Sequence, residues 1–281
     1  MKIKTTRSNF SSFLKKIISA SLITYSSSAN TGPLINDAVL NTEDGKLRCK
    51  AREGGNAMLI DIFLEEVEVI EDGKLTLKDL KKILKIIDAV PAEDMMTIEY
   101  PFMSEKRAHV STRKMTADFP TAEPIDIISS MEVEDSTGES LLSDNFSLTK
   151  ENFMLSPTSE MLGSFTMDAN DLRNLDKMAN AASIATCVIE IRDDKTISFS
   201  WRKPNSDVNV TNTCDIIFEG TPFNYICTYS VGLYAASKYI TGERITVMVE
   251  SSKDALIFLG DLEGYALLPT DDDGYGEESD E

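Results

Sequence analysis

The sequence TLKDLKKILKIIDAV, at residues 76–90, predicts the element around which the fold is organised. Its apolar residues recur at steps of three and four, which places them on one face of a helix. Thr76 and Asp79 have the spacing of a capping box, and Pro91 ends the helix. The apolar face consists of Leu77, Leu80, Ile83, Leu84 and Ile87. The stretch therefore predicts an amphipathic helix with one buried face.

Four lysines follow the same steps on the opposite face of this helix, namely Lys78, Lys81, Lys82 and Lys85. At ~100° per residue they fall within an arc of roughly 100°. Asp79 and Asp88 are the acidic residues nearby in the sequence. For one helix alone, a solvated surface explains this pattern. Its meaning therefore depends on whether other helices repeat it.

The overall charge makes these lysines stand out. The chain has 281 residues, with 28 Lys and Arg against 47 Asp and Glu, so its net charge is -19. A uniformly acidic surface repels DNA and anionic membranes, and lysines gathered on one helix are then a segregated feature. No apolar run reaches the ~18 residues that a membrane helix needs, so no membrane partner is predicted.

Motifs of catalysis and metal binding are missing from the sequence. The four cysteines have no CxxC spacing, and His109 is the single histidine. We find no phosphate-binding GxxxxGK[ST], no GxGxxG and no nucleophile paired in sequence with a base. The sequence therefore predicts no catalytic residues, no metal site and no cofactor, and the protein is not expected to be an enzyme.

A first helix is predicted from Ser8 or Asn9 to about Ala20. Its apolar face is Phe10, Phe13, Leu14, Ile17 and Ile18, and Lys15 and Lys16 lie off that face. Strands and turns follow, with a turn at Asp44 and Gly45, and the lysine-rich helix comes next. Strands at 95–102 and 107–115 complete an N-terminal domain, residues 1–118.

Residues 119–160 are predicted to be an exposed connector, because prolines, serines and acidic residues interrupt the pattern. A C-terminal domain then covers residues 161–270. It contains a helix at 169–182 with Arg173 and Lys177 on its outer face, a hairpin at 188–201 and a helix at 231–240 that carries Lys238. Strands at 244–250, 255–259 and 264–268 follow, and residues 271–281 form an acidic tail predicted to be disordered.

Strands and helices thus alternate in the same layout in both halves, and this order resembles the DNA sliding clamp family. That family includes the archaeal and eukaryotic proliferating cell nuclear antigen and the clamps of T-even-type phages. The segments that carry the resemblance are SNFSSFLKKIISA, TLKDLKKILKII, DANDLRNLDKMANAA and the C-terminal stretch from FNYICTYS to ALLP. The connector is longer than those of these clamps, and the acidic tail extends past the last strand.

The resemblance implies an α+β fold of two similar clamp domains, each with antiparallel sheets outside and two helices facing the lumen of a ring. It implies a homotrimer that encircles double-stranded DNA without reading its sequence. DNA polymerase and a clamp loader ATPase are the further partners implied, and the expected location is the cytoplasm, or the nucleoid of a host. The residues expected to face DNA are Lys15, Lys16, Lys78, Lys81, Lys82, Lys85, Arg173, Lys177 and Lys238.

The resemblance also implies an apolar pocket for partner peptides between the connector and the last strand. Its expected residues are Ile125, Ile127, Ile128, Tyr265, Leu267, Leu268 and Pro269. The strands expected to join subunits are near 107–115 and 207–217. Two other interpretations remain open: a heterotrimer subunit or monomeric processivity factor of the same fold, and a secreted or surface-anchored β-rich binding protein whose first ~29 residues are a signal segment.

Overall fold

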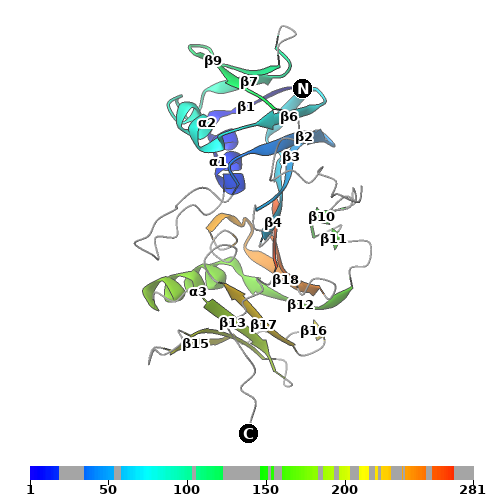
Figure 1. Ribbon diagram of the computed structural model, residues 1–281, viewed down its shortest axis with the longest axis vertical. Coiled ribbons are helices and arrows are strands. Elements are labelled where there is room, and N and C mark those ends of the chain that lie inside the picture. The colour runs from blue at the N-terminus through cyan, green and yellow to red at the C-terminus, as the bar shows by residue number, and fades with distance from the viewer. Residues whose placement is uncertain are drawn as a thin grey trace.

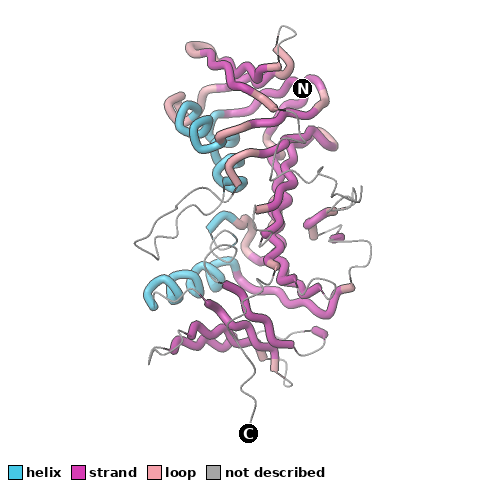
Figure 2. The backbone as a smooth tube through the Cα atoms, viewed as in Figure 1, coloured by secondary structure: helices cyan, strands magenta, loops and turns pink. Residues whose placement is uncertain are grey.

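The computed structural model describes residues 1–18, 35–53, 58–102, 106–122, 146–150, 153–154, 160–182, 186–192, 196–202, 209–214, 219–220, 223–228, 236, 238–250 and 255–268. The described helices are α1 (Arg7–Ile18), α2 (Leu80–Ile87) and α3 (Ala169–Ala182). They lie along one side of an elongated molecule, and the long central sheet lies on the other (Figures 1 and 2). The expected helix at 231–240 falls mostly outside the described residues.

A nine-stranded sheet runs through both halves of the chain in the order β16-β12-β18-β19-β20-β4-β3-β2-β6. The two halves join where β20 pairs antiparallel with β4, for example at Tyr265 and Ile60. Its strands are β2 (Ala38–Glu43), β3 (Lys46–Arg52), β4 (Met58–Leu64), β6 (Lys74–Leu77), β12 (Met161–Asp168), β16 (Glu219–Gly220), β18 (Arg244–Glu250), β19 (Ala255–Leu259) and β20 (Glu263–Leu267).

Each half adds a smaller antiparallel sheet. The first has the order β5-β1-β7-β8-β9, from β1 (Lys2–Thr6), β5 (Val67–Glu71), β7 (Met95–Glu99), β8 (Arg107–Ser111) and β9 (Thr116–Pro120). The second has the order β15-β14-β13-β17, from β13 (Thr186–Ile191), β14 (Ile197–Arg202), β15 (Asn209–Cys214) and β17 (Phe223–Thr228). The expected α+β class is therefore confirmed.

The main core lies between the sheets and the helices and is continuous through both halves. Alternate residues of a strand face opposite sides of a sheet, and in β4 the side chains of Met58, Ile60 and Ile62 pack in this core. On α1 each residue of the predicted apolar face is at most 7% exposed, namely Phe10, Phe13, Leu14, Ile17 and Ile18. Removal of a signal segment would delete β1 and α1 from this core, which argues against the secreted interpretation.

A second apolar cluster lies on the other face of the central sheet. We call it the outer-face cluster; it consists of Leu59, Phe146, Leu148, Ala255, Ile257, Leu259 and Ala266. The sheet residues of the cluster alternate with those of the main core. This explains why β4 and β19 have nearly continuous apolar sequences, since a strand that is buried on both faces has no polar side.

The helix boundaries partly differ from those expected. Residues 74–77 form β6 and pair with β2, so Thr76 is a buried strand residue and no capping box forms. Asp79 is the N-cap of α2 instead, and its carboxylate accepts from the Lys82 amide at 3.3 Å. On α1 the cap is Thr6, whose hydroxyl accepts from the Asn9 amide at 3.2 Å, rather than Ser8 or Asn9.

The connector boundaries also change. β9 extends to Pro120, so a domain boundary at 118 would cut through a paired strand. Within the expected connector, β10 (Ser147–Leu148) pairs with β11 (Phe153–Met154). Residues 123–145, which include much of the acidic connector, and the tail at 271–281 lie outside the described residues. Among the described residues no helix is long and apolar enough to cross a membrane.

Candidate functional site

Basic side chains cover the exposed face of α2. Lys81, Lys82 and Lys85 are exposed, and the residues between and beside them, Leu80 and Ile83, are buried in the main core. Lys78 is also exposed, but it precedes the helix in the short segment after β6. The helical arc predicted for four lysines therefore holds for three of them.

In the second half, basic residues lie on α3 and next to it. Lys177 is exposed on α3, and Arg173 is half-buried, donating to Asn170 Oδ1 at 3.0 Å and to the Ile240 carbonyl at 3.3 Å. Lys238 is exposed, with its ammonium 5.2 Å from the centre of the Tyr239 ring. The two helices α2 and α3 lie on the same side of the molecule (Figure 2).

The two lysines of α1 have different environments. Lys15 is partly exposed and its ammonium lies 3.3 Å from Asp88 Oδ2. Lys16 instead pairs with Glu263, and the side chains are 12% and 0% exposed. Glu263 also accepts from the amide and hydroxyl of Thr241 at 2.8 and 2.7 Å. Lys16 therefore holds the first helix to the last strand, and the expectation that it faces DNA is not met.

Asp88 joins α1 to the end of α2. Its carboxylate accepts from Ser11 at 2.6 Å and from Arg7 at 3.2 Å, in addition to the contact with Lys15. Partial burial opposes the charge on this carboxyl, but the bonds from Ser11 and Lys15 and the charges of Lys15 and Arg7 outweigh it and lower the pKa of Asp88. The pair of helices is therefore held in one arrangement by an ionised side chain.

The expected peptide pocket is only partly built from the predicted residues. Tyr265 and Leu267 point into the main core and are 0% and 3% exposed, so the expectation that they line a surface pocket is wrong. The period of two along a strand is the reason: Gly264, Ala266 and Leu268 face the opposite side. Leu268 packs on the outer-face cluster. Ile125, Ile127, Ile128 and Pro269 lie outside the described residues.

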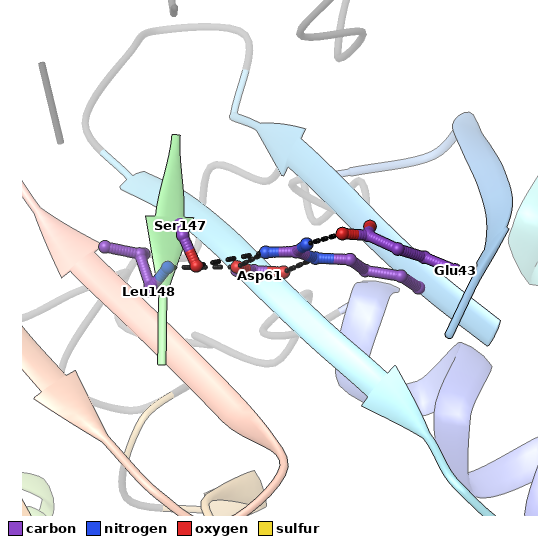
Figure 3. A network of polar contacts seen from close by, with 5 residues as sticks. Glu43, Asp61, Ser147 and Leu148 are labelled. Carbon is purple, nitrogen blue, oxygen red and sulfur yellow. Dashed lines mark hydrogen bonds and ion pairs between the residues drawn. The ribbon is translucent and has the colours of Figure 1, made fainter. Parts of the chain in front are cut away.

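A buried ion pair lies beside the outer-face cluster (Figure 3). Arg48 of β3 donates to both carboxylate oxygens of Asp61 in β4, at 2.8 and 2.6 Å. It also donates to Glu43 at 2.7 Å and to the Ser147 hydroxyl at 3.2 Å. Asp61 in turn accepts from the Leu148 amide at 2.9 Å. The pair therefore connects the central sheet to β10.

The sequence analysis above does not predict this network. The signal that could have revealed it is the single carboxylate in the apolar strand MLIDIFL, because a buried charge needs a partner. Burial disfavours the charged guanidinium of Arg48, but its bonds to Asp61 and Glu43 and their charges outweigh that effect and raise the pKa of Arg48.

Edge strands lie at the outer limits of the two small sheets. β15 is an edge of its sheet, in agreement with the expected region 207–217. In the first half the edges are β5 and β9, and β8 is not an edge because β9 covers it through pairs such as His109 with Asp118. Edge strands carry unpaired backbone groups and are natural sites of association between chains.

Comparisons with known proteins agree with this architecture. No protein-family model and no curated protein sequence matches the chain. Among solved structures, the chain is similar to the beta subunit of DNA polymerase III from Thermotoga maritima, with a TM-score of 0.67 and 15% identity over 96% of this chain and 65% of that one. The chain thus spans about two thirds of the length of this bacterial subunit.

Two archaeal structures match the chain over nearly their whole lengths. The PCNA2-PCNA3 complex from Sulfolobus tokodaii has a TM-score of 0.65 and 12% identity over 96% of this chain and 99% of that one. The proliferating cell nuclear antigen of A. fulgidus, bound to the C-terminal region of FEN-1, has a TM-score of 0.63 and 12% identity over 96% and 98%. The chain has the fold of the DNA sliding clamps.

Proposed function

We propose that this protein is a DNA sliding clamp, a non-enzymatic processivity factor that encircles duplex DNA and tethers DNA polymerase and other replication proteins. The observation that carries the proposal is the basic helix side of a strongly acidic chain with a clamp fold. Lys81, Lys82 and Lys85 are exposed on α2, although the net charge is -19. Positive charge is thus concentrated where a ring of this fold would meet DNA.

The proposed DNA-facing residues are Lys15, Lys78, Lys81, Lys82, Lys85, Arg173, Lys177 and Lys238. A clamp must slide, so it needs diffuse attraction to phosphates rather than contacts with base edges. Lysines suit this task because their ammonium groups are mobile point charges on flexible stems. The acidic remainder of the surface would suppress DNA binding elsewhere.

Ring closure would use the edge strands β9 and β15. Pairing of β9 in one subunit with β15 in the next is a heterologous contact, which closes a ring when the rotation between subunits is correct. The Sulfolobus structure is a complex of two clamp chains, which supports association through this fold. We propose a homotrimer, with a heterotrimer subunit or a monomer as the other outcomes of the test.

Partner proteins are proposed to bind on the outer face, near Leu268 and the connector. The A. fulgidus clamp carries the C-terminal region of FEN-1, which supports peptide capture by this fold. A DNA polymerase and a clamp loader ATPase are the proposed partners, because a closed ring has no chemistry of its own and must be opened to admit DNA. This role would be carried out in the cytoplasm or nucleoid.

Light scattering across a range of protein concentrations tests the ring. At protein concentrations on the order of tens of micromolar, where association of typical strength is complete, a ring is populated. The expected mass is then three times the 31.1 kDa of one chain. A mass of one chain at every concentration would contradict the homotrimer. A mass that reaches three chains when a different clamp chain is added would identify a heterotrimer subunit.

A further inference from the structure

The outer-face cluster is covered by the chain's own connector. Phe146 and Leu148, two residues apart, are each 1% exposed and pack on Leu59, Ile257 and Ala266 of the central sheet. Without this cover, the sheet residues of the cluster would form an apolar patch in the middle of the central sheet. An apolar sheet face of this kind is a binding surface for whatever covers it.

The cover is held by side chains rather than by sheet pairing. β10 pairs with β11 in a separate two-stranded sheet, and the central sheet has no β10 in its strand order. Its polar contacts to the sheet include the bond from the Leu148 amide to Asp61 and the bond from Arg48 to the Ser147 hydroxyl (Figure 3). Two residues further on, Lys150 donates to Asp261 Oδ1 at 2.7 Å and to the Arg244 carbonyl at 3.3 Å. Because these bonds lie outside the ladder of the large sheet, β10 can leave without breaking that ladder.

Gly264 of β20 provides the space in which β10 lies. A Cβ at this position would overlap the carbonyl oxygen and Cβ of Leu148. The residues after Gly264 alternate between the two faces of the sheet, with Tyr265 toward the main core and Ala266 toward the outer-face cluster. Any side chain at position 264 would therefore point toward the outer-face cluster. The sheet is therefore shaped to accept an extended backbone at this point.

We propose that β10 fills a peptide-binding groove in the free protein. An extended segment of a partner protein binds in this groove when β10 dissociates from it. The partner segment has two large apolar side chains two residues apart, with a hydroxyl residue between them. This inference rests on the proposed function, because it concerns how a clamp would receive its partners. It adds that the groove is closed by the connector in the free protein.

The groove itself defines this chemistry. The apolar side chains replace Phe146 and Leu148 on Leu59 and Ile257. Asp61 accepts a backbone N–H and Arg48 donates to the hydroxyl, so neither buried charge loses its partner. A segment with a lysine or arginine at the middle position would place its charge beside the Arg48 guanidinium and bind less well, because like charges repel.

The test uses a fluorescent peptide with the sequence of residues 146–154, FSLTKENFM, and the full-length chain. In the wild type β10 occupies the groove, so the peptide binds only to the fraction of molecules in which the groove is open. The apparent affinity for the peptide is lowered in proportion to that fraction. The double variant Phe146→Ser/Leu148→Ser empties the groove. We expect fluorescence anisotropy to show at least about tenfold tighter binding to the variant than to the wild type. Equal binding to both proteins, or to neither, would overturn the proposal.

A control peptide with serine in place of its Phe and Leu should bind neither protein. A second measurement does not depend on the folding of the double variant: Gly264→Ala should push β10 off the sheet and speed hydrogen exchange of the Leu148 amide at least about tenfold. The amides of Tyr265 and Leu267 serve as internal references. Unchanged protection of Leu148 would contradict the proposal.

Neither measurement involves DNA, a polymerase or ring assembly. A protein that stays monomeric can still show the peptide result, and then the proposed clamp function fails while this inference stands. If the protein forms a trimer but its groove never binds the peptide, this inference fails while the proposed clamp function stands.

Discussion

Lys16 in the first helix donates to the buried carboxylate of Glu263 in the last described strand, 247 residues away. The contact ties α1 to β20, which in turn pairs with β4. The two halves of the chain are therefore joined by a buried charge pair as well as by backbone hydrogen bonds.

This pair predicts a large effect of one substitution. Lys16→Met would leave Glu263 buried and without its ammonium partner, and breaking a buried pair in this way costs about 3–5 kcal/mol of unfolding free energy. Urea denaturation followed by circular dichroism measures the change. Lys15→Met is the matched control, because Lys15 is 44% exposed and a surface pair contributes about 0–1 kcal/mol. Equal stability of the two variants would contradict the role assigned to Lys16.

Asp88 predicts a dependence of stability on pH. Its pKa in the folded protein is lowered from the ordinary 3.8, so its contribution is fully present above that value and is lost as pH falls through the folded-state pKa. The wild type should be more stable than Asp88→Asn at neutral pH, and the difference should shrink below pH 3.8. Glu93→Gln, at an exposed acidic residue after α2, is the control. A difference that is independent of pH would argue against the charged junction.

The exposed lysines of α2 predict a change in DNA binding without a change in folding. Lys81→Glu/Lys85→Glu should weaken affinity for duplex DNA and lower the slope of log affinity against log salt by about 2, since each lost phosphate contact removes about 0.9. Each change should alter stability by at most about 0.5 kcal/mol. Lys4→Glu is the control, because Lys4 lies on β1 beside Glu68 rather than on a helix. If Lys4→Glu has the same effect on DNA, the helix side is not the DNA-binding side.

The Arg48 network predicts that two neighbouring basic residues of β3 differ in importance. Arg48→Met would leave Asp61, which is 0% exposed, without the two hydrogen bonds that it accepts from Arg48, at a cost of about 3–5 kcal/mol. Lys46→Met affects a pair with Glu65 in which both side chains are over 40% exposed, and about 0–1 kcal/mol is expected. Thermal unfolding of the two variants tests this contrast, and similar melting temperatures would show that the network adds little.

Elements with strong local signals were predictable from the sequence. α3, β18 and β19 begin and end where the apolar period and the cap at Asp168 predict, and the Asp168 carboxylate accepts from the Asn170 amide at 2.7 Å. β1 was missed because KIKTT has one apolar residue, Ile3, and its strand character comes from pairing with β5 and β7. Thr76 and Leu77 of β6 resemble the start of the following helix in sequence, because Leu77 continues its apolar period and Thr76 has the spacing of a cap.

The site was less predictable because its contacts join distant parts of the chain. Nothing near Lys16 in the sequence indicates Glu263, so a lysine on a helix was expected to face solvent. The resemblance assigns Tyr265 to a surface pocket, but the face on which it lies depends on the register of β20 against β4, which cannot be derived from β20 alone. The two-residue β10 has no periodic pattern, and its place depends on Asp61 and Gly264.

Topological binding to DNA distinguishes a ring around the duplex from a protein that is held on it by charge. A duplex is tethered to a bead at one end, the protein is threaded onto it, the free end is blocked with a bulky group, and the beads are washed at high salt. Salt releases proteins that are held by charge alone. We expect the protein to stay on the blocked duplex through the wash and to leave when a restriction enzyme removes the block. Release by salt from the blocked and the open duplex alike would contradict a ring around DNA.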